Sequence, residues 1–371
     1  MAKRILFLIP DLMHGGAEKV LVNLVNNLDR SKYDITLFSL FDCGVNKDYL
    51  DAGINYRYKF KIKLRGNSHF FKLFSPKFLY QWIITDEYDI AIAYLEGVAA
   101  RIISGCPTPT TKKVAWLHTE IRNESLLKTS FRSFYEAVNC YKQCDRIIGV
   151  SKDIAESFRR RVSRSLPVEV LYNVNDTEEI LLKARGGVED EHYVGSEISI
   201  CSVGKIVSVK GYDRLLEAHH RLIVEGLQHH VYIIGCGEGQ KKLERRAAEL
   251  GVADSFKFLG FHKNPYKYIS QCGLYVCSSR REGFSTAVTE ALVLGLPVVS
   301  TDCSGAKELL GENDEFGLVV ENSTEGVYQG MKRMLSEPGL LEYYREQSAI
   351  RGQRFSKMKT VKAVEDMLDS M

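Results

Sequence analysis

The sequence predicts an α/β fold made of two doubly wound domains, each built on a parallel sheet. Short, continuous apolar segments alternate with helical patterns along nearly the whole chain. Strands that helices cover on both faces are continuously apolar, so these segments favour parallel sheets over half-exposed antiparallel ones. The pattern restarts once, after a polar and turn-rich stretch at 174–196, and each half opens with a buried strand.

The elements follow in the same order in both halves. Between the first two candidate strands, the segment Ala17–Leu28 has an apolar face at helical spacing. The candidate strands are Arg4–Pro10, Asp34–Leu40, Asp89–Tyr94, Lys113–His118, Arg146–Val150, Ile198–Gly204, Val231–Gly235, Phe256–Gly260, Leu274–Ser278 and Pro297–Thr301. We therefore expect Rossmann-like domains at 1–174 and 196–355 that face a central cleft, with 356–371 as a separate amphipathic helix.

The composition is that of a soluble globular protein. Apolar residues make up 45% and charged residues 26% of the 371 residues. A formal net charge of +3 excludes a nucleic-acid coat by bulk charge, and no apolar segment approaches the roughly 20 residues of a membrane span. The nine cysteines include no Cys-x-x-Cys pair, which suits reduced thiols in the cytoplasm. Four paired histidines are expected at the surface: His219, His220, His229 and His230.

Basic residues are concentrated in the first half of the chain. Residues 1–180 carry 26 basic and 21 acidic side chains, whereas residues 181–371 carry 24 and 26. Arg57–Lys77, the basic aromatic segment, holds seven Lys or Arg residues, no Asp or Glu, and several phenylalanines. This composition suits an anionic membrane surface, at about 1 kcal/mol per well-placed cation, and would make the protein peripheral on the inner face of the cell membrane. The alternative is a solvated basic face over ordinary core aromatics.

The strongest local pattern for a ligand site is the segment 281–292, which leads from a strand into an apolar helix. Ser285 or Thr286 is suited to cap that helix. The amides of Gly283, Phe284 and Ser285 would then point out of a helix N-terminus, which attracts anions because of its partial positive charge. The segment therefore predicts a phosphate site.

Two carboxylates and two lysines accompany this phosphate site. Glu282 would precede the helix and Glu290 would lie within it, where carboxylates can accept hydrogen bonds from sugar hydroxyls. Lys205 and Lys210 lie in the loop after the first strand of the second half, where they could neutralise a diphosphate without a metal. Each residue by itself could be an ordinary helix acid or a solvated lysine, so the combination carries the prediction.

These residues match the motifs of a known family. The sequence resembles the retaining GT-B glycosyltransferases of glycosyltransferase family 4, with a Glu-x7-Glu signature, a basic pair, an N-terminal glycine turn and a strand-end histidine. The matching residues are Gly15, Gly16, His118, Lys205, Lys210, Glu282 and Glu290. The family often has Arg at the first position of the basic pair, and Lys205 keeps the charge but loses the bidentate fork. The resemblance covers essentially the whole chain.

The resemblance implies that Glu282, His118, Lys205 and Lys210 are catalytic. Glu282 and His118 would lie against the donor sugar, and the lysines would hold the diphosphate leaving group. The implied donor-binding residues, with Glu290 at the ribose and the last two at the base, are Gly15, Gly16, Gly283, Phe284, Ser285, Glu290, Phe261 and His262. Taken alone, a glycine turn occurs in many α/β folds, and a lone histidine such as His118 is often structural.

The implied activity is transfer of a sugar, with retention at the anomeric carbon, from a nucleotide-diphosphate sugar. By family habit the donor is a UDP-sugar, and the acceptor is a hydroxyl of a saccharide or lipid-linked saccharide in cell-surface polysaccharide synthesis. The first domain would bind the acceptor and the second the donor. The chain has no Asp-x-Asp and no metal-ligand spacing, so we expect a metal-independent hexosyltransferase without a cofactor. The alternatives are a GT-B nucleotide-sugar epimerase, a nicotinamide-dependent oxidoreductase and a non-catalytic nucleotide-sugar binding module.

Overall fold

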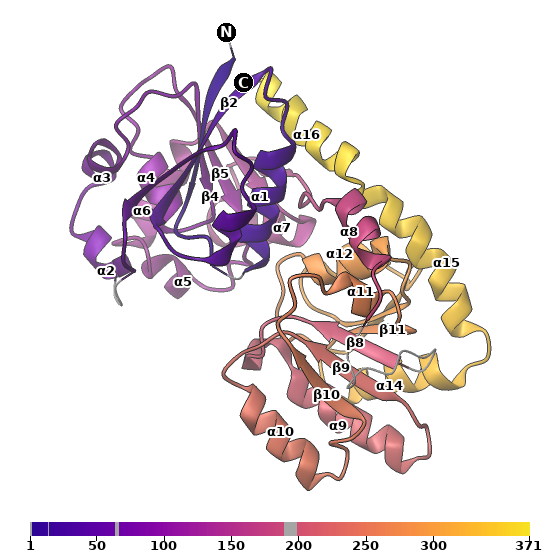
Figure 1. Ribbon diagram of the computed structural model, residues 1–371. Coiled ribbons are helices and arrows are strands. Elements are labelled where there is room, and N and C mark those ends of the chain that lie inside the picture. Colours follow the sequence, from indigo (N-terminus) through magenta and orange to yellow (C-terminus); the bar gives the residue numbers. More distant parts are fainter. Residues whose placement is uncertain (1, 14, 64–66, 189–198) are drawn as a thin grey trace. The chain divides into compact units, whose positions relative to one another are not determined.

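The computed structural model describes residues 2–13, 15–63, 67–188 and 199–371. The chain divides into two compact units, one of residues 1–175 with 358–371 and the other of residues 176–357. Each unit has a parallel sheet flanked by helices, which confirms the predicted α/β fold of two Rossmann-like domains (Figure 1). The expected start of the second domain at 196 lies outside the described residues, as does Arg65 of the basic aromatic segment.

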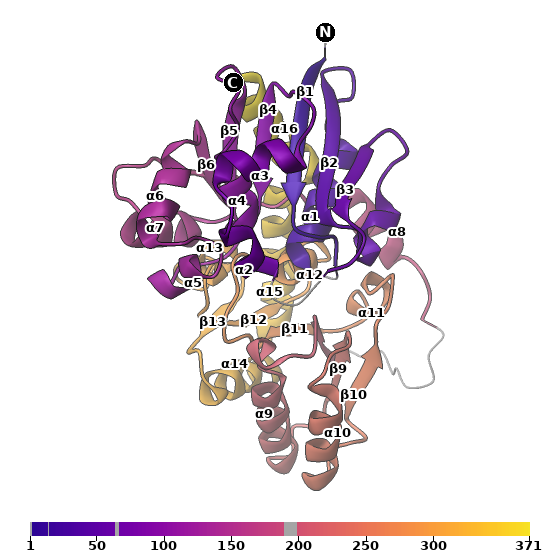
Figure 2. The ribbon, with the colours of Figure 1, turned by 90° about the vertical axis from the view of Figure 1, so that its left-hand side faces the viewer.

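The sheet of the first unit has the strand order β3-β2-β1-β4-β5-β6-β7, which can be followed from β3 to β6 in Figure 2. Its strands are β1 (Lys3–Ile9), β2 (Tyr33–Phe41), β3 (Asn55–Phe60), β4 (Ile90–Tyr94), β5 (Lys112–Leu117), β6 (Arg146–Gly149) and β7 (Glu169–Val170). In the central strand β1, Ile5 pairs with Ile35 of β2 and with Ile90 of β4. The side chains of β1 from Ile5 to Ile9 are fully buried because helices cover both faces.

Helices α3, α4 and α6 lie on one face of this sheet, and α1 and α16 lie on the other (Figure 1). The helices of the first unit are α1 (Gly16–Asn27), α2 (Asn67–Lys72), α3 (Pro76–Ile83), α4 (Val98–Ile103), α5 (Glu124–Lys128), α6 (Phe134–Lys142), α7 (Lys152–Arg161) and α16 (Lys357–Asp369). Two long-range hydrogen bonds hold α16 in place, from the Tyr33 hydroxyl to the Asp369 carboxylate (2.5 Å) and from Lys3 Nζ to the Leu368 carbonyl (2.9 Å). The last helix of the chain therefore packs with the first unit.

The second unit repeats this architecture with the strand order β10-β9-β8-β11-β12-β13. Its strands are β8 (Ser199–Val203), β9 (His230–Ile234), β10 (Phe256–Gly260), β11 (Leu274–Cys277), β12 (Val298–Thr301) and β13 (Leu318–Val320). Its helices are α8 (Thr177–Ala184), α9 (Tyr212–Val224), α10 (Gln240–Glu249), α11 (Tyr266–Ile269), α12 (Thr286–Val293), α13 (Ala306–Leu310), α14 (Thr324–Ser336) and α15 (Leu340–Gly352). One buried apolar cluster joins α9 and α14 to the strands, and includes Leu215, Leu222, Val231 and Met331.

Both sheets reverse their strand order beside their first strand, between β1 and β4 in the first unit and between β8 and β11 in the second. In doubly wound sheets, ligands bind outside the carboxyl ends of the strands at such a reversal, because neighbouring loops turn to opposite faces there. The loops after β8 and β11, and those after β1 and β4, are therefore the places where the fold favours a site.

The expected surface position of the paired histidines is wrong for two of them. His219 and His229 are buried, and they form a hydrogen-bonded row with Ser255. His229 Nδ1 lies 2.8 Å from the Leu227 carbonyl and must donate to it, so its Nε2 accepts from His219 Nδ1 at 2.8 Å. His219 Nε2 then accepts from the Ser255 hydroxyl, also at 2.8 Å. Every ring nitrogen is satisfied with both rings neutral, and burial lowers the pKa of His219 to about 3.

Candidate functional site

The loops after β8 and β11 come together at the strand-order reversal of the second unit. Residues Ser208–Lys210 form a short 3₁₀ helix between β8 and α9, and the Ser278 hydroxyl after β11 donates to the Lys210 carbonyl at 3.0 Å. The sequence predicted candidate residues in both loops, and the fold brings them together.

Lys210 and Glu282 form an ion pair in this place. Lys210 Nζ lies 2.7 Å from Glu282 Oε1, and the Ser279 hydroxyl donates to the same oxygen at 2.5 Å. The side chains are 25% and 13% exposed, so the pair is largely withdrawn from water but still accessible. Burial opposes the lysine charge, but attraction to Glu282 outweighs it and raises the pKa of Lys210. The site therefore holds a fixed positive charge at neutral pH.

Two glycines lie where a side chain would crowd Lys210 or the neighbouring loop. Gly204 has φ +154°, and a Cβ there would lie 3.3 Å from Lys210 Cε, so the lysine stem runs across a residue without a side chain. Gly211 has φ +68°, and a Cβ there would lie 2.0 Å from the Ser278 carbonyl oxygen. Only glycine adopts this left-handed conformation at such a close approach without strain. The two loops can therefore approach each other because Gly211 stands where they meet.

Helix α12 begins next to the pair. Of the two caps that the sequence allows, Ser285 is the N-cap, and its hydroxyl accepts from the Val288 amide. The first helical residue is Thr286, so Gly283 and Phe284 belong to the preceding loop rather than to the first turn. The first amides of a helix have no partner within it, and α12 therefore offers an anion-attracting end shortly after Glu282 in the chain.

The second glutamate of the Glu-x7-Glu pattern is buried. Glu290 is 3% exposed, and the Tyr266 hydroxyl of α11 donates to its Oε1 at 3.1 Å. Because both Glu290 and Ser285 belong to α12, one helix carries the carboxylate at a fixed offset from its own N-terminus. Tyr266 is a residue that the sequence analysis did not single out, because a tyrosine in a short helix gives no pattern of its own.

The remaining candidates of the second unit lie apart from this pair. Lys205 is exposed and makes no ion pair with a described residue. Phe261 is 50% exposed in the loop after β10, and the neighbouring His262 ring is held by the Leu259 carbonyl (2.9 Å) and the Tyr268 ring. Phe261 is thus exposed on that loop, and the His262 ring beside it in sequence is fixed.

Two cysteines near the pair were not predicted as site residues. Cys277 ends β11, and Cys303 follows the neighbouring strand β12. The hydrogen bond with Cys303 lowers the pKa of the Cys277 thiol against the opposing effect of burial. Both thiols are buried. Adjacency of two strand ends is visible only once the strand order is known.

In the first unit, His118 follows β5. Its ring packs on Tyr94 with centroids 4.6 Å apart, and its Nε2 is buried with no hydrogen-bond partner among the described residues. The Glu96 carboxylate accepts from the His118 amide at 2.9 Å, which fixes the backbone. Burial lowers the pKa of His118 to about 3, so the imidazole is neutral. A polar group that reached its buried Nε2 could form a hydrogen bond with it.

The glycine turn of the first unit precedes α1. Gly15 is the N-cap of α1 and Gly16 is its first residue. A Cβ on Gly15 would lie 2.0 Å from a carboxylate oxygen of Glu18, so the turn packs directly against that side chain. Burial raises the pKa of Glu18, and nearby Asp11 adds to the effect. This turn stands after β1, at the strand-order reversal of its unit.

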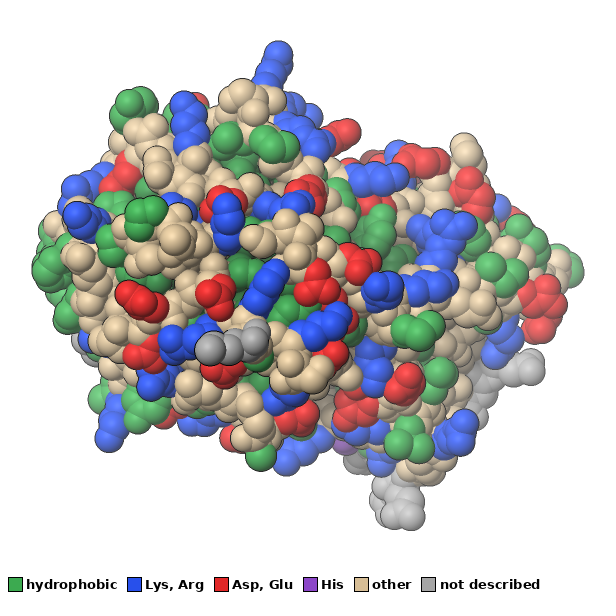
Figure 3. Space-filling view, turned by 90° about the horizontal axis from the view of Figure 1, so that it is seen from above, with side chains coloured by type: hydrophobic (Ala, Val, Ile, Leu, Met, Phe, Trp, Pro, Cys, Tyr) green, Lys and Arg blue, Asp and Glu red, His purple; other side chains and the backbone are tan. Residues whose placement is uncertain are grey.

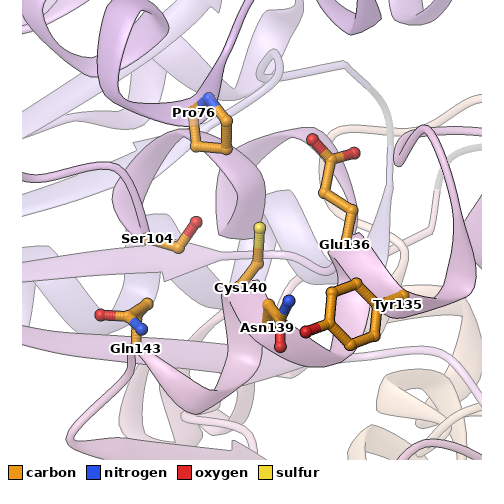
Figure 4. Close-up of a pocket in the computed structure, with 7 residues that line it drawn as sticks. All are labelled: Pro76, Ser104, Tyr135, Glu136, Asn139, Cys140 and Gln143. Atoms are coloured by element: carbon orange, nitrogen blue, oxygen red, sulfur yellow. The ribbon is translucent and has the colours of Figure 1, made fainter.

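A separate hollow of about 350 Å³ lies in the first unit (Figure 4). It is lined by Pro76, Ser104, Tyr135, Glu136, Asn139, Cys140 and Gln143. Glu136 is the charged residue of this lining, and it already accepts hydrogen bonds from the Arg101 side chain and the Arg132 amide. None of the predicted site residues lines the hollow, so it is distinct from the candidate site.

Two family models match the chain, one in each half. The model described as Glycosyltransferase Family 4 matches residues 14–179, and the model described as Glycosyl transferases group 1 matches residues 190–351. The chain belongs to the group 1 and family 4 type of GT-B glycosyltransferases.

Curated relatives share this assignment. A Campylobacter jejuni protein named N-acetylgalactosamine-N,N'-diacetylbacillosaminyl-diphospho-undecaprenol 4-alpha-N-acetylgalactosaminyltransferase is 33% identical over 263 residues, which is 70% of this chain and 66% of that protein, slightly under two thirds. An uncharacterized glycosyltransferase of Haemophilus influenzae is 24% identical over 94% of both chains.

Solved structures share the fold at lower identity. Anabaena HepE in complex with UDP and glucose is 20% identical, covers 100% of both chains and gives a TM-score of 0.79. A sucrose-phosphate synthase from Thermosynechococcus elongatus is 14% identical and gives a TM-score of 0.80, covering 99% of this chain and 98% of that one. At these identities the likeness supports the GT-B fold, not a substrate.

Proposed function

We propose that this glycosyltransferase transfers a sugar from a nucleotide-diphosphate sugar, with retention and without a metal, to a hydroxyl of a saccharide or lipid-linked saccharide. The observation that carries the proposal is the Lys210–Glu282 pair beside the N-terminus of α12. This arrangement sets a fixed cation and a helix end beside a carboxylate, which suits a ligand with a diphosphate at one end and hydroxyls at the other.

The residues of the second unit account for the leaving group. Breaking the bond between sugar and phosphate develops negative charge on the diphosphate, and the Lys210 ammonium and the amides of α12 would stabilise it. Such preorganised electrostatic stabilisation is commonly the largest catalytic contribution. Lys205 would add a second, exposed cation from the same loop. Glu282 would accept hydrogen bonds from sugar hydroxyls, and Glu290, oriented by Tyr266, would do so from the ribose.

His118 suits a role toward the donor sugar as a neutral hydrogen-bonding group. Its Nε2 has no partner among the described residues, so a sugar hydroxyl would satisfy it. Gly15 and Gly16 would let the backbone approach the donor phosphate or the acceptor where side chains would obstruct. Phe261 and His262 would meet the base through their loop.

Metal independence rests on the available residues. The described part of the chain has no group of three or more His, Cys, Asp or Glu side chains suited to hold a metal ion. Lys210 and the helix amides would take over the charge neutralisation that a divalent cation provides in other enzymes. Activity that persists undiminished in EDTA would support this part of the proposal, and loss that Mg²⁺ or Mn²⁺ restores would refute it.

The donor and acceptor classes follow from the relatives. UDP is the nucleotide in the Anabaena complexes, and the Campylobacter protein is named for transfer to a diphospho-undecaprenol-linked sugar. Others are named for lipopolysaccharide core biosynthesis in Rhizobium meliloti. We therefore propose a UDP-sugar donor and a role in cell-surface polysaccharide or lipopolysaccharide synthesis.

The basic aromatic segment is proposed to contact an anionic membrane surface on the cytoplasmic side. Its phenylalanines form a cluster with Trp82, in which Phe74 and Phe78 stack with centroids 5.1 Å apart. Leu73 is 72% exposed at the end of α2, and Phe78 is 48% exposed at the start of α3. Exposed apolar side chains such as these suit insertion among lipid headgroups.

Some of the basic side chains of this segment form ion pairs with acidic residues of the same unit. Arg57 pairs with Asp86, and Lys63 Nζ lies 2.5 Å from Asp11. On the face drawn in Figure 3, Lys and Arg side chains are interspersed with Asp and Glu. The electrostatic share of membrane binding is therefore smaller than seven cations would give. In the described part of the chain, no helix is both long and apolar enough to cross a membrane.

The segment is anchored by a buried arginine. Arg101 is fully buried, and its guanidinium donates to the Phe71 carbonyl (2.8 Å), the Phe74 carbonyl (2.7 Å) and Glu136 (2.8 Å). Arg132 donates to the carbonyls of the two residues between them. These bonds fix the turn after α2 and hold Leu73 at the surface.

The test is a panel of UDP- and GDP-sugars read by thermal shift, followed by a screen of lipid-linked saccharide acceptors. A glycosylated acceptor whose new bond keeps the anomeric configuration of the donor, by NMR, is the expected result. An inverted product would refute retention. Release of free sugar with no glycosylated acceptor would favour the nucleotide-sugar epimerase, and binding without turnover would favour a non-catalytic module.

A further inference from the structure

We propose that Arg280 and Asp213 are positioning residues that lock the loop after β8 to the loop after β11, and so hold Lys210 beside Glu282. The inference rests on the proposed function, because it assigns these residues to the diphosphate part of the donor site. Neither residue belongs to the motifs that the sequence analysis identified, and neither bonds directly to Lys210 or Glu282.

The Arg280 guanidinium reaches from one loop across to the other. Its Nη1 and Nη2 donate to the two carboxylate oxygens of Asp213 at 2.8 and 2.6 Å, in a bidentate pair. The same Nη1 donates to the Ser208 carbonyl at 2.7 Å. Asp213 lies in the first turn of α9, and Ser208 begins the 3₁₀ helix that contains Lys210. One side chain therefore bonds to a residue on each side of Lys210, to the backbone of Ser208 and to the carboxylate of Asp213.

Backbone contacts follow the same line between the two loops. The Arg280 amide donates to the Val209 carbonyl at 2.8 Å, and the Ser278 hydroxyl donates to the Lys210 carbonyl. The Asn322 amide group donates to the Arg280 carbonyl at 3.2 Å. The backbone of Arg280 is thus fixed by hydrogen bonds, and its side chain bonds to the loop after β8.

The pair is charged over the working pH range. The hydrogen bond from Arg280 lowers the pKa of Asp213, so the carboxylate stays ionised at neutral pH. Lysine could not replace Arg280, because a single ammonium cannot span both carboxylate oxygens and the Ser208 carbonyl with the geometry of a planar fork. We call the bonds of Arg280 to Asp213 and to the Ser208 carbonyl the clamp. The clamp therefore requires an arginine and not only a positive charge.

The clamp predicts an effect confined to the diphosphate. If the loop after β8 loosens, Lys210 loses its fixed place, and an ångström-scale misplacement of a catalytic group can cost about 100-fold in rate. The base and ribose contacts proposed for Phe261, His262 and Glu290 lie on other segments and are expected to be preserved. A merely structural role for the pair would weaken all nucleotide binding together.

The experiment measures binding of UDP and UMP by isothermal titration calorimetry to the full chain, together with kcat and KM for the donor. The variants are Arg280→Gln, the isosteric Asp213→Asn and their double variant. The control is Arg246→Gln, which removes the Arg246–Glu217 pair (2.9 Å) of similar exposure elsewhere in the second unit. Arg280→Lys tests whether charge alone suffices.

We expect both single variants to weaken UDP binding about tenfold, with UMP binding changed less than twofold and kcat reduced. The double variant should lose no more than either single one, because both remove the same clamp. Arg246→Gln should match the wild type. Equal loss of UDP and UMP, unchanged UDP binding, or full activity in Arg280→Lys would overturn the inference. Wild-type protein that binds neither UDP nor GDP would instead overturn the proposed function.

Discussion

Replacing Lys210 by Met is expected to remove most of the catalytic rate while leaving the fold intact. Lys210 Nζ is the cation of the ion pair with Glu282, at 2.7 Å. Loss of one preorganised donor to a developing negative charge costs about 3–4 kcal/mol, or roughly 10²–10³ in kcat. Methionine keeps the length and apolar stem of lysine, so packing across Gly204 should be preserved.

The cost to folding is smaller and can be separated from the cost to catalysis. The variant leaves Glu282, 13% exposed, with the Ser279 hydroxyl as its remaining partner on Oε1. Breaking an exposed ion pair costs at most about 1 kcal/mol of stability, and breaking a fully buried one costs about 3–5 kcal/mol. The Lys210–Glu282 pair is partly buried, so we expect the variant to lose about 2 kcal/mol of unfolding free energy. Adding Glu282→Gln removes the uncompensated charge, and should restore stability but not activity.

The assay is donor turnover followed by nucleotide release with an acceptor present, alongside urea unfolding. Lys332→Met is the matched control, because Lys332 pairs with Glu225 at 2.8 Å on the exposed surface of the same unit. We expect this control to stay within about twofold of wild-type activity. A Lys210→Met enzyme with kcat within threefold of the wild type would refute the assignment of Lys210 to the leaving group.

Three further predictions concern other parts of the fold. His219 and His229 are buried, and their lowered pKa values mean that the unfolded state binds more protons than the folded state below about pH 6.5. The free energy of unfolding should therefore decrease as the pH falls below this value, by at most about 1.4 kcal/mol per pH unit for each histidine, and a double Gln variant should show a shallower acid slope in urea unfolding. Arg101→Met removes the donor to two backbone carbonyls and to the Glu136 carboxylate, and should lower the free energy of unfolding by about 3–5 kcal/mol. A loss under about 1 kcal/mol would contradict the anchoring role of Arg101. Leu73→Ser should weaken sedimentation with anionic vesicles at low salt several-fold, whereas the equally exposed Val224→Ser should not; equal effects would argue against the membrane surface.

Much of the fold could be predicted because its central strands are continuously apolar. All ten predicted strands are present, and no strand end is displaced by more than one residue. Three strands were missed, namely β3, β7 and β13. Strand β3 lies at the sheet edge with no fully buried residue and has no apolar run, and the other two are only 2 and 3 residues long.

The sequence indicated candidate site residues, but it could not show which of them are in contact. Lys210, Glu282 and Ser285 were singled out from the sequence, and the structure brings Lys210 and Glu282 together because β8 and β11 are neighbours at the strand-order reversal. Arg280 and Asp213 were missed because their pair joins two loops that are 67 residues apart in sequence. Ser279 was missed because a serine three residues before Glu282 gives no pattern of its own. The burial of His219 was missed because hydrogen bonds can satisfy a polar ring inside a core.

The most direct test of the proposed transfer is the stoichiometry of one turnover experiment. Nucleoside diphosphate released and sugar added to the acceptor, measured by mass spectrometry of the acceptor, are expected to agree one to one in the wild type. Both should fall together, by roughly 10²-fold or more, in Lys210→Met. Nucleotide release without a mass increase on any acceptor would contradict transfer, and so would a Lys210→Met enzyme that glycosylates the acceptor at the wild-type rate.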